Sequence, residues 1–119
     1  MAGVLTTAGK DIVLNSDAAW PPAYASVHNV DAPTDNTTEP SGGSPAYARK
    51  ALTWGTSSGN SKALAATLPV FDIPAAFTVK SVGLWSALTN GTLYGYWDVT
   101  DEAFAGQGTY TVSSGTVTL

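Results

Sequence analysis

Hydrophobic and polar positions alternate with a period of two along most of the chain, a pattern typical of half-buried β-strands. Residues 24–29 place Tyr, Ser and His on one face and Ala, Val and Asn on the other. The alternation resumes over residues 47–54 and again, after a Gly- and Ser-rich turn, over residues 62–74. Pro69 favours an edge position or a bulge in that last strand.

A hairpin is the clearest local prediction. Residues 77–88 and 92–99 are strand-like and flank the pair Asn90-Gly91. Asn followed by Gly supplies the two positive φ angles of a type I′ turn. Two further β-branched runs follow around Gly115.

The N-terminal residues show a different period. Apolar side chains recur at offsets of three and seven in residues 4–14, which suits one face of a short helix: Leu5, Ala8 and Ile12. Thr6 or Thr7 can cap such a helix, although residues 11–14 also fit a strand.

About seven short strands separated by Gly and Pro predict an all-β fold, an antiparallel β-sandwich or a jelly-roll-like single domain. We expect an N-terminal segment at 1–22, forming a short helix or arm, followed by the β-sandwich domain at 23–119. Residues 31–45 contain three prolines, two glycines and no large apolar side chain, so we expect an exposed loop there.

Composition removes several classes of function. Five basic residues stand against nine acidic ones, so the chain lacks the cationic surface that binds nucleic acid. No cysteine is present to form a disulfide or a thiolate metal site. The N-terminal residues carry neither a secretory pattern nor a long apolar run, and we expect no membrane partner.

Candidate chemistry is sparse. His28 is the single histidine and has no second histidine to form a metal pair. Oxygen ligands for calcium are present in the 31–45 loop, at Asp31, Asp35, Asn36 and Glu39, but turn formation explains these residues equally well. We therefore predict no catalytic residue, metal or cofactor.

Aromatic side chains gather on the predicted hairpin, at Trp85, Tyr94, Tyr96 and Trp97. They form a candidate aromatic patch that could stack on sugar. Trp85 and Trp97 flank the turn at nearly symmetric offsets, so cross-strand pairing in the core is the simpler interpretation.

Several short motifs occur in a specific order. The run "AYASVHNVDAPTDNTTEPSGGSPAYARKALTWGTSSGN" precedes "FDIP" and then "VGLWSALTNGTLYGY". This order, over roughly residues 20 to 110, resembles a family of small virion structural proteins of tailed bacteriophages. The resemblance implies a β-sandwich module on capsid surfaces, tails or tail fibres, with a non-enzymatic assembly role.

Within this pattern we expect a structural clip. Glu39 and Arg49 would form a charge-assisted pair that folds the 31–45 loop back onto the sheet, with Tyr47 packed beneath it. The loop so shaped is a candidate contact surface, presented by Asp31, Asp35, Asn36 and Glu39.

The function expected first is that of a capsid decoration or minor capsid protein. It would bind the major capsid protein as a homotrimer and stabilise the assembled head, after synthesis in the host cytoplasm. The alternative is a tail or tail-fibre component that contacts host surface glycan. A glycan hydrolase using Asp98 or Glu102 comes third.

Overall fold

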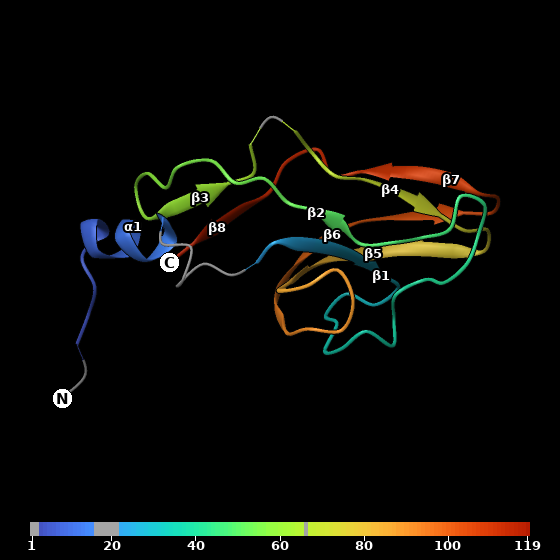
Figure 1. The fold of residues 1–119 in the computed structure, drawn as a ribbon, viewed down its shortest axis with the longest axis horizontal. Helices are drawn as coiled ribbons and strands as arrows, with labels where there is room; N and C mark the ends of the chain where they lie inside the picture. The colour runs from blue at the N-terminus through green and yellow to red at the C-terminus, as the bar shows by residue number, and fades with distance from the viewer. Residues whose placement is uncertain (1–2, 16–21, 66) are drawn as a thin grey trace.

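The computed structural model describes residues 3–15, 22–65 and 67–119. Figure 1 shows the one helix and the eight strands found in these ranges. Their bounds are α1 (Thr7–Asn15), β1 (Tyr24–His28), β2 (Lys50–Ala51), β3 (Ser61–Ala63), β4 (Val70–Ile73), β5 (Phe77–Trp85), β6 (Leu93–Phe104), β7 (Gly108–Thr111) and β8 (Thr116–Thr118).

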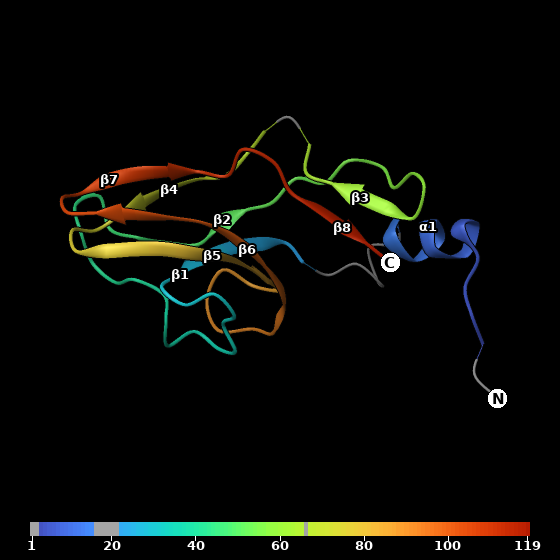
Figure 2. The ribbon, with the colours of Figure 1, turned by 180° about the vertical axis from the view of Figure 1, so that it is seen from behind.

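All strand pairs are antiparallel, which confirms the predicted all-β class. The main sheet has the order β2-β1-β5-β6, and two ribbons, β4-β7 and β3-β8, complete the fold. The molecule is elongated, with extents of 50 × 31 × 24 Å. In Figures 1 and 2, α1 and the β3-β8 ribbon lie toward one end of the long axis, and the β6-β7 turn lies at the other.

One face of the main sheet packs against the β4-β7 ribbon to form the core. The buried cluster takes alternate residues of β1, two residues of β5 on either side of a register shift, and apolar residues of the ribbon and its continuation: Ala25, Val27, Val79, Val82, Phe71, Ile73 and Val112. Burying one large aliphatic or aromatic side chain of this kind contributes about 1.5–3 kcal/mol. The two layers give the sandwich-like arrangement that the alternation predicted.

The hairpin of β5 and β6 is confirmed, but its connection is longer than a two-residue turn. Asn90 and Gly91 both have positive φ angles, 56° and 77°. The strands nevertheless stop at Trp85 and resume at Leu93, and these two residues face each other in the register. The predicted cross-strand pairing of the two tryptophans is therefore wrong, because Trp97 lies opposite Val82.

The predicted strand at 62–74 is two strands, β3 and β4. Pro69 lies just before β4 and has no N–H to continue a ladder. Its carbonyl instead accepts a hydrogen bond from Val112 N at 3.1 Å. The predicted strand at 47–54 is also reduced, to β2.

The N-terminal helix is confirmed as α1, with the side chain of Thr6 accepting a hydrogen bond from Gly9 N at 3.2 Å. Its predicted apolar face is wrong as a core face, because Leu5 and Ile12 are 53% and 72% exposed while Leu14 is fully buried. Besides the buried Leu14, polar contacts hold the helix in place. Asp11 Oδ1 accepts hydrogen bonds from Ser57 Oγ and Asn60 N, and Asn15 Oδ1 accepts one from Ser57 N.

No helix in the described ranges combines the length and apolarity that a membrane crossing would need. The predicted boundary at residue 22 adjoins residues 16–21, which lie outside the described residues, so that boundary stays a prediction.

Candidate functional site: the clipped loop end

Two loops cover the polar face of the main sheet. The 29–49 loop joins β1 to β2, and the 86–92 loop joins β5 to β6. Figures 1 and 2 show the two loops together on the side of the main sheet opposite the β4-β7 ribbon. Side chains of the 31–45 region are mostly exposed, as predicted, apart from Pro33, Thr38, Glu39 and Pro40.

Arg49 joins the two loops. It is 6% exposed. Its Nε and Nη2 donate to the two carboxylate oxygens of Glu39 at 3.0 and 2.9 Å. Its Nη1 donates to the carbonyls of Ala87 and Asn90 at 3.1 and 2.7 Å. A bidentate pair of this kind fixes direction as well as distance, which a lysine cannot reproduce.

The guanidinium also lies over the Trp85 ring, with Arg49 Cζ 3.7 Å from the ring centroid. This cation–π contact closes the site from the sheet side. The structure thus brings Glu39 and Arg49 together and adds three partners that the sequence did not indicate: Trp85, Ala87 and Asn90.

Tyr47 ties the clip to the edge of β1. Its hydroxyl accepts a hydrogen bond from Val27 N at 3.1 Å and donates one to Glu39 Oε1 at 2.8 Å. Burial and then the Glu39 charge raise the pKa of Tyr47, so it remains a donor. Its ring stacks on Phe71 at 6.3 Å. Tyr47 therefore links the polar clip to the apolar core.

A chain of buried hydrogen bonds runs beneath the clip. Trp85 Nε1 donates to Ser26 Oγ at 2.7 Å, Ser26 Oγ lies 2.5 Å from His28 Nε2, and His28 Nδ1 lies 2.8 Å from Thr38 Oγ1. Ser26 Oγ already accepts from Trp85 Nε1, so we assign the Ser26 hydroxyl as the donor to His28 Nε2. The neutral ring of His28 then carries its proton on Nδ1 and donates it to Thr38 Oγ1. Every ring nitrogen in this chain has a partner.

His28 is fully buried, and burial lowers its pKa to about 4. The Glu39 charge opposes this shift, while the Arg49 charge adds to it. Gly83 leaves room for these hydrogen-bonded side chains, because a Cβ there would meet Ser26 Oγ and would lie 2.8 Å from His28 Nε2. The strict alternation of 24–29 was the only sequence signal for this polar face.

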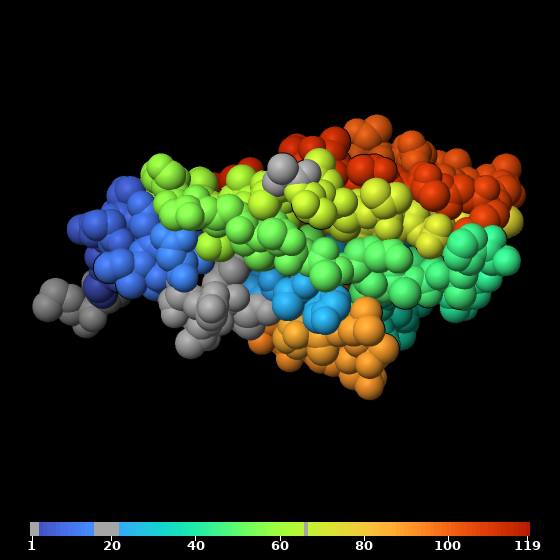
Figure 3. Space-filling view, turned by 45° about the horizontal axis from the view of Figure 1, so that its top comes forward, coloured from blue at the N-terminus to red at the C-terminus, as the bar shows by residue number. Residues whose placement is uncertain are grey.

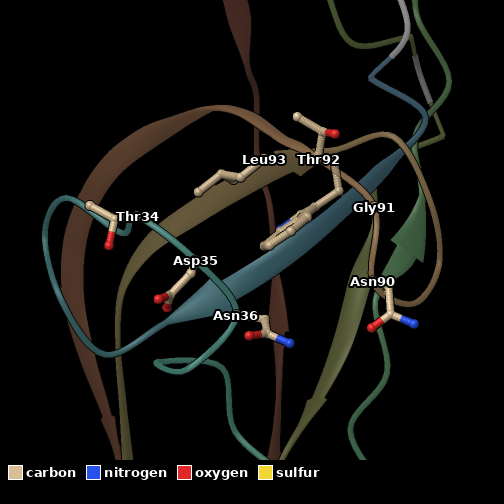
Figure 4. A pocket seen from close by; sticks show the side chains of 8 residues that line it. Thr34, Asp35, Asn36, Asn90, Gly91, Thr92 and Leu93 are labelled. Carbon is tan, nitrogen blue, oxygen red and sulfur yellow. The ribbon is translucent and has the colours of Figure 1, made fainter.

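A hollow of about 440 Å³ opens between the two loops. Figure 4 shows Thr34, Asp35 and Asn36 on one loop and Asn90, Gly91 and Thr92 on the other, with Leu93 beside them. Hydroxyl, amide and carboxylate groups share this lining with the apolar side chains of Trp85 and Leu93.

The predicted contact residues do not all face outward. Asp31, Asp35 and Asn36 are exposed. Glu39 is turned inward by Arg49 and Tyr47, so the part of the prediction that presented it for contact is wrong. Hydrogen bonds from the Thr37 side chain and backbone lower the pKa of Asp35. Within the described ranges, no three histidine or acidic side chains gather closely enough to hold a metal ion.

The predicted aromatic patch is divided. Trp85 is 4% exposed and belongs to the clip, so it is not part of a surface patch. Tyr94 and Tyr96 are 50% and 45% exposed. Trp97 is half-buried and donates from Nε1 to Thr116 O at 3.0 Å.

The two acids considered for glycan hydrolysis, Asp98 and Glu102, lie exposed on β6. They also line a hollow of about 460 Å³ with Tyr110 and the 112–114 segment.

One family model matches residues 1–119, the whole chain, and it is described as "Podophage GP4 fiber I protein gp80". No curated protein and no solved structure matches the chain.

The clip generates a stability prediction. Arg49→Ala leaves the Glu39 carboxylate buried without its counter-charge and removes the donor of two carbonyls. We expect the free energy of unfolding to fall by about 3–5 kcal/mol in urea denaturation. Hydrogen exchange should show faster exchange at Asn29 and Ser86, whose amides are bonded within the two loops. The matched control is Lys80→Ala, because Lys80 forms an exposed 4.0 Å pair with Asp101 and should contribute about 0–1 kcal/mol. Equal losses in the two variants would contradict the role given to Arg49.

The buried histidine generates a pH prediction. The pKa of His28 is about 4 in the folded chain against 6.5 for the ordinary side chain, so between these values the unfolded state binds more protons. Stability is therefore complete above pH 6.5 and falls by about 3 kcal/mol as the pH drops to 4. Thermal denaturation of the native chain and of His28→Gln across this range checks it. The variant should have a flatter profile. Asp35 adds its own loss only below its ordinary pKa of 3.8.

Proposed function

The chain belongs to the podophage GP4 fiber I protein gp80 family, and we propose that it serves as a fibre component of the virion. It is a bacteriophage virion structural protein. The single observation that carries the fibre proposal is a family match that spans all 119 residues. Capsid decoration, the function expected first from the sequence, has less support than its tail-fibre alternative.

The proposed role is structural and not enzymatic. The contact between Ser26 and His28 has both residues at 0% exposure, so no substrate can reach it. The clip stabilises the shape and spacing of two surface loops, 29–49 and 86–92. Binding to the major capsid protein and formation of a homotrimer stay predictions that belong to the capsid function expected from the sequence.

Immunogold labelling of intact particles tests the location. We expect an antibody against this chain to label fibres and to leave the head shell unlabelled. Co-sedimentation of the purified chain with isolated tails and, separately, with empty capsids provides the control. Saturable binding to capsids with unlabelled fibres would overturn the fibre proposal and restore decoration.

A second role is favoured by the hollow between the loops: contact with a neutral host glycan. Its lining offers hydroxyl and amide groups, which match sugar hydroxyls, beside the carboxylate of Asp35 and the indole of Trp85. Arg49 places four hydrogen bonds on protein acceptors, so it is not the group that would recognise the ligand. Recognition would come from Thr34, Asn36 and Asn90.

The glycan role predicts a selective loss. Asn36→Ala should weaken binding to purified host surface polysaccharide by about tenfold, since one good polar contact contributes about 1–2 kcal/mol. Asn29→Ala is the matched control, because Asn29 is also exposed but lies outside the hollow. Biolayer interferometry measures both. Unchanged binding in Asn36→Ala, or absence of binding by the native chain, would remove this role.

A further inference from the structure

Two edge strands border an apolar hollow. Among the described residues, β6 pairs only with β5, and β8 pairs only with β3. Between them lies a hollow of about 340 Å³, lined by residues 94–97 of β6 and 116–118 of β8, with Pro22 and Leu84. Trp97 joins the strands through its bond to Thr116 O.

The hollow is unusual on this surface because no charged side chain lines it. The chain as a whole carries a net charge of −4, so most contacts between copies would bring like charges together. A neutral hollow beside two half-exposed tyrosines avoids that repulsion. Open strand edges also present unpaired backbone groups, which bind extended segments by strand addition.

The same chain exposes a segment with matching chemistry. Residues 3–6 precede α1 without regular secondary structure, carry no charge and expose Val4 at 91%. Figure 3 shows the N-terminal segment at one end of the long axis. The side chain of Leu5 lies near Gly9 of α1, whereas Val4 is more exposed than any other large hydrophobic side chain in the described ranges. Four extended residues span about 13 Å, which suits the four β6 residues of the hollow.

Residues 3–6, called the arm below, are held away from the hollow between β6 and β8 of the same copy. Leu14 is fully buried, and Asp11 and Asn15 bond to the 57–60 turn, so the helix is fixed to the molecule at its C-terminal half. The arm projects from the opposite end of α1, beyond the rest of the chain in Figures 1 and 2.

We propose that residues 3–6 of one copy add to the edge of β6 in a second copy, with Val4 seated in the hollow between β6 and β8. The contact is head-to-tail, since the arm of each copy meets the hollow of the next. Such contacts repeat into an open chain, or close into a ring where the rotation allows. This inference deepens the proposed fibre role and rests on it.

Sedimentation velocity of the full chain over a concentration series tests the contact. We expect the native chain to self-associate and Val4→Asp to weaken the association by at least about tenfold, because a carboxylate would enter an apolar site. Thr7→Asp is the matched control: it adds the same charge in the first turn of α1, where an acid is favourable, and should associate like the native chain.

A second pair of variants tests the hollow between β6 and β8. Tyr96→Asp should lose association, whereas Thr100→Asp, on the same strand but outside the hollow, should retain it. Circular dichroism and thermal midpoints check that each variant is folded.

A mixture provides the sharpest result. Val4→Asp keeps an intact hollow and Tyr96→Asp keeps an intact arm, so the two monomeric variants together should form a dimer and nothing larger. A native chain that stays monomeric, or a Val4→Asp variant that associates like the native chain, would overturn the inference. Fibre labelling with a monomeric chain would overturn this contact alone, whereas self-association without fibre labelling would overturn the proposed function.

Discussion

A buried guanidinium governs the loop end of this molecule. Arg49 lies under two loops where water cannot replace lost hydrogen bonds, so each of its donors needs a protein acceptor. Glu39 supplies the counter-charge, two carbonyls of the 86–92 loop take another pair of hydrogen bonds, and Trp85 supplies an aromatic face. These partners come from two separate parts of the chain, the 31–45 loop and residues 85–90. The geometry of Arg49 therefore sets how the loops lie relative to the sheet.

The main sheet has two buried faces of opposite chemistry. In β1, Ala25 and Val27 enter the apolar core, while Ser26 and His28 enter the hydrogen-bonded layer beneath the loops. A polar layer of this kind is stable only while its groups are satisfied and covered. Tyr47 connects the two environments, since its ring contacts Phe71 and its hydroxyl contacts Glu39.

Local patterns predicted much of this structure. Alternation located β1 and β5, and the Asn90-Gly91 pair located the hairpin, because both signals depend on neighbouring residues. The symmetric placement of Trp85 and Trp97 favoured a buried Trp85 but gave it the wrong partner. Its contact with Arg49 and the length of the 86–92 loop could not be predicted, since they depend on an arginine some forty residues away. The helical period of residues 4–14 identified α1 but not its buried face. Periodicity identifies an apolar stripe on a helix but does not identify which of its side chains the rest of the fold covers.

The bonds that hold the 86–92 loop fall on backbone carbonyls of Ala87 and Asn90. Main-chain acceptors are present whatever side chain a position carries. An outward position of this loop such as Thr89 can therefore change without loosening the anchor beneath it. A rigid β-framework of this kind fixes the backbone of a loop tip while leaving the side chains displayed there free to differ.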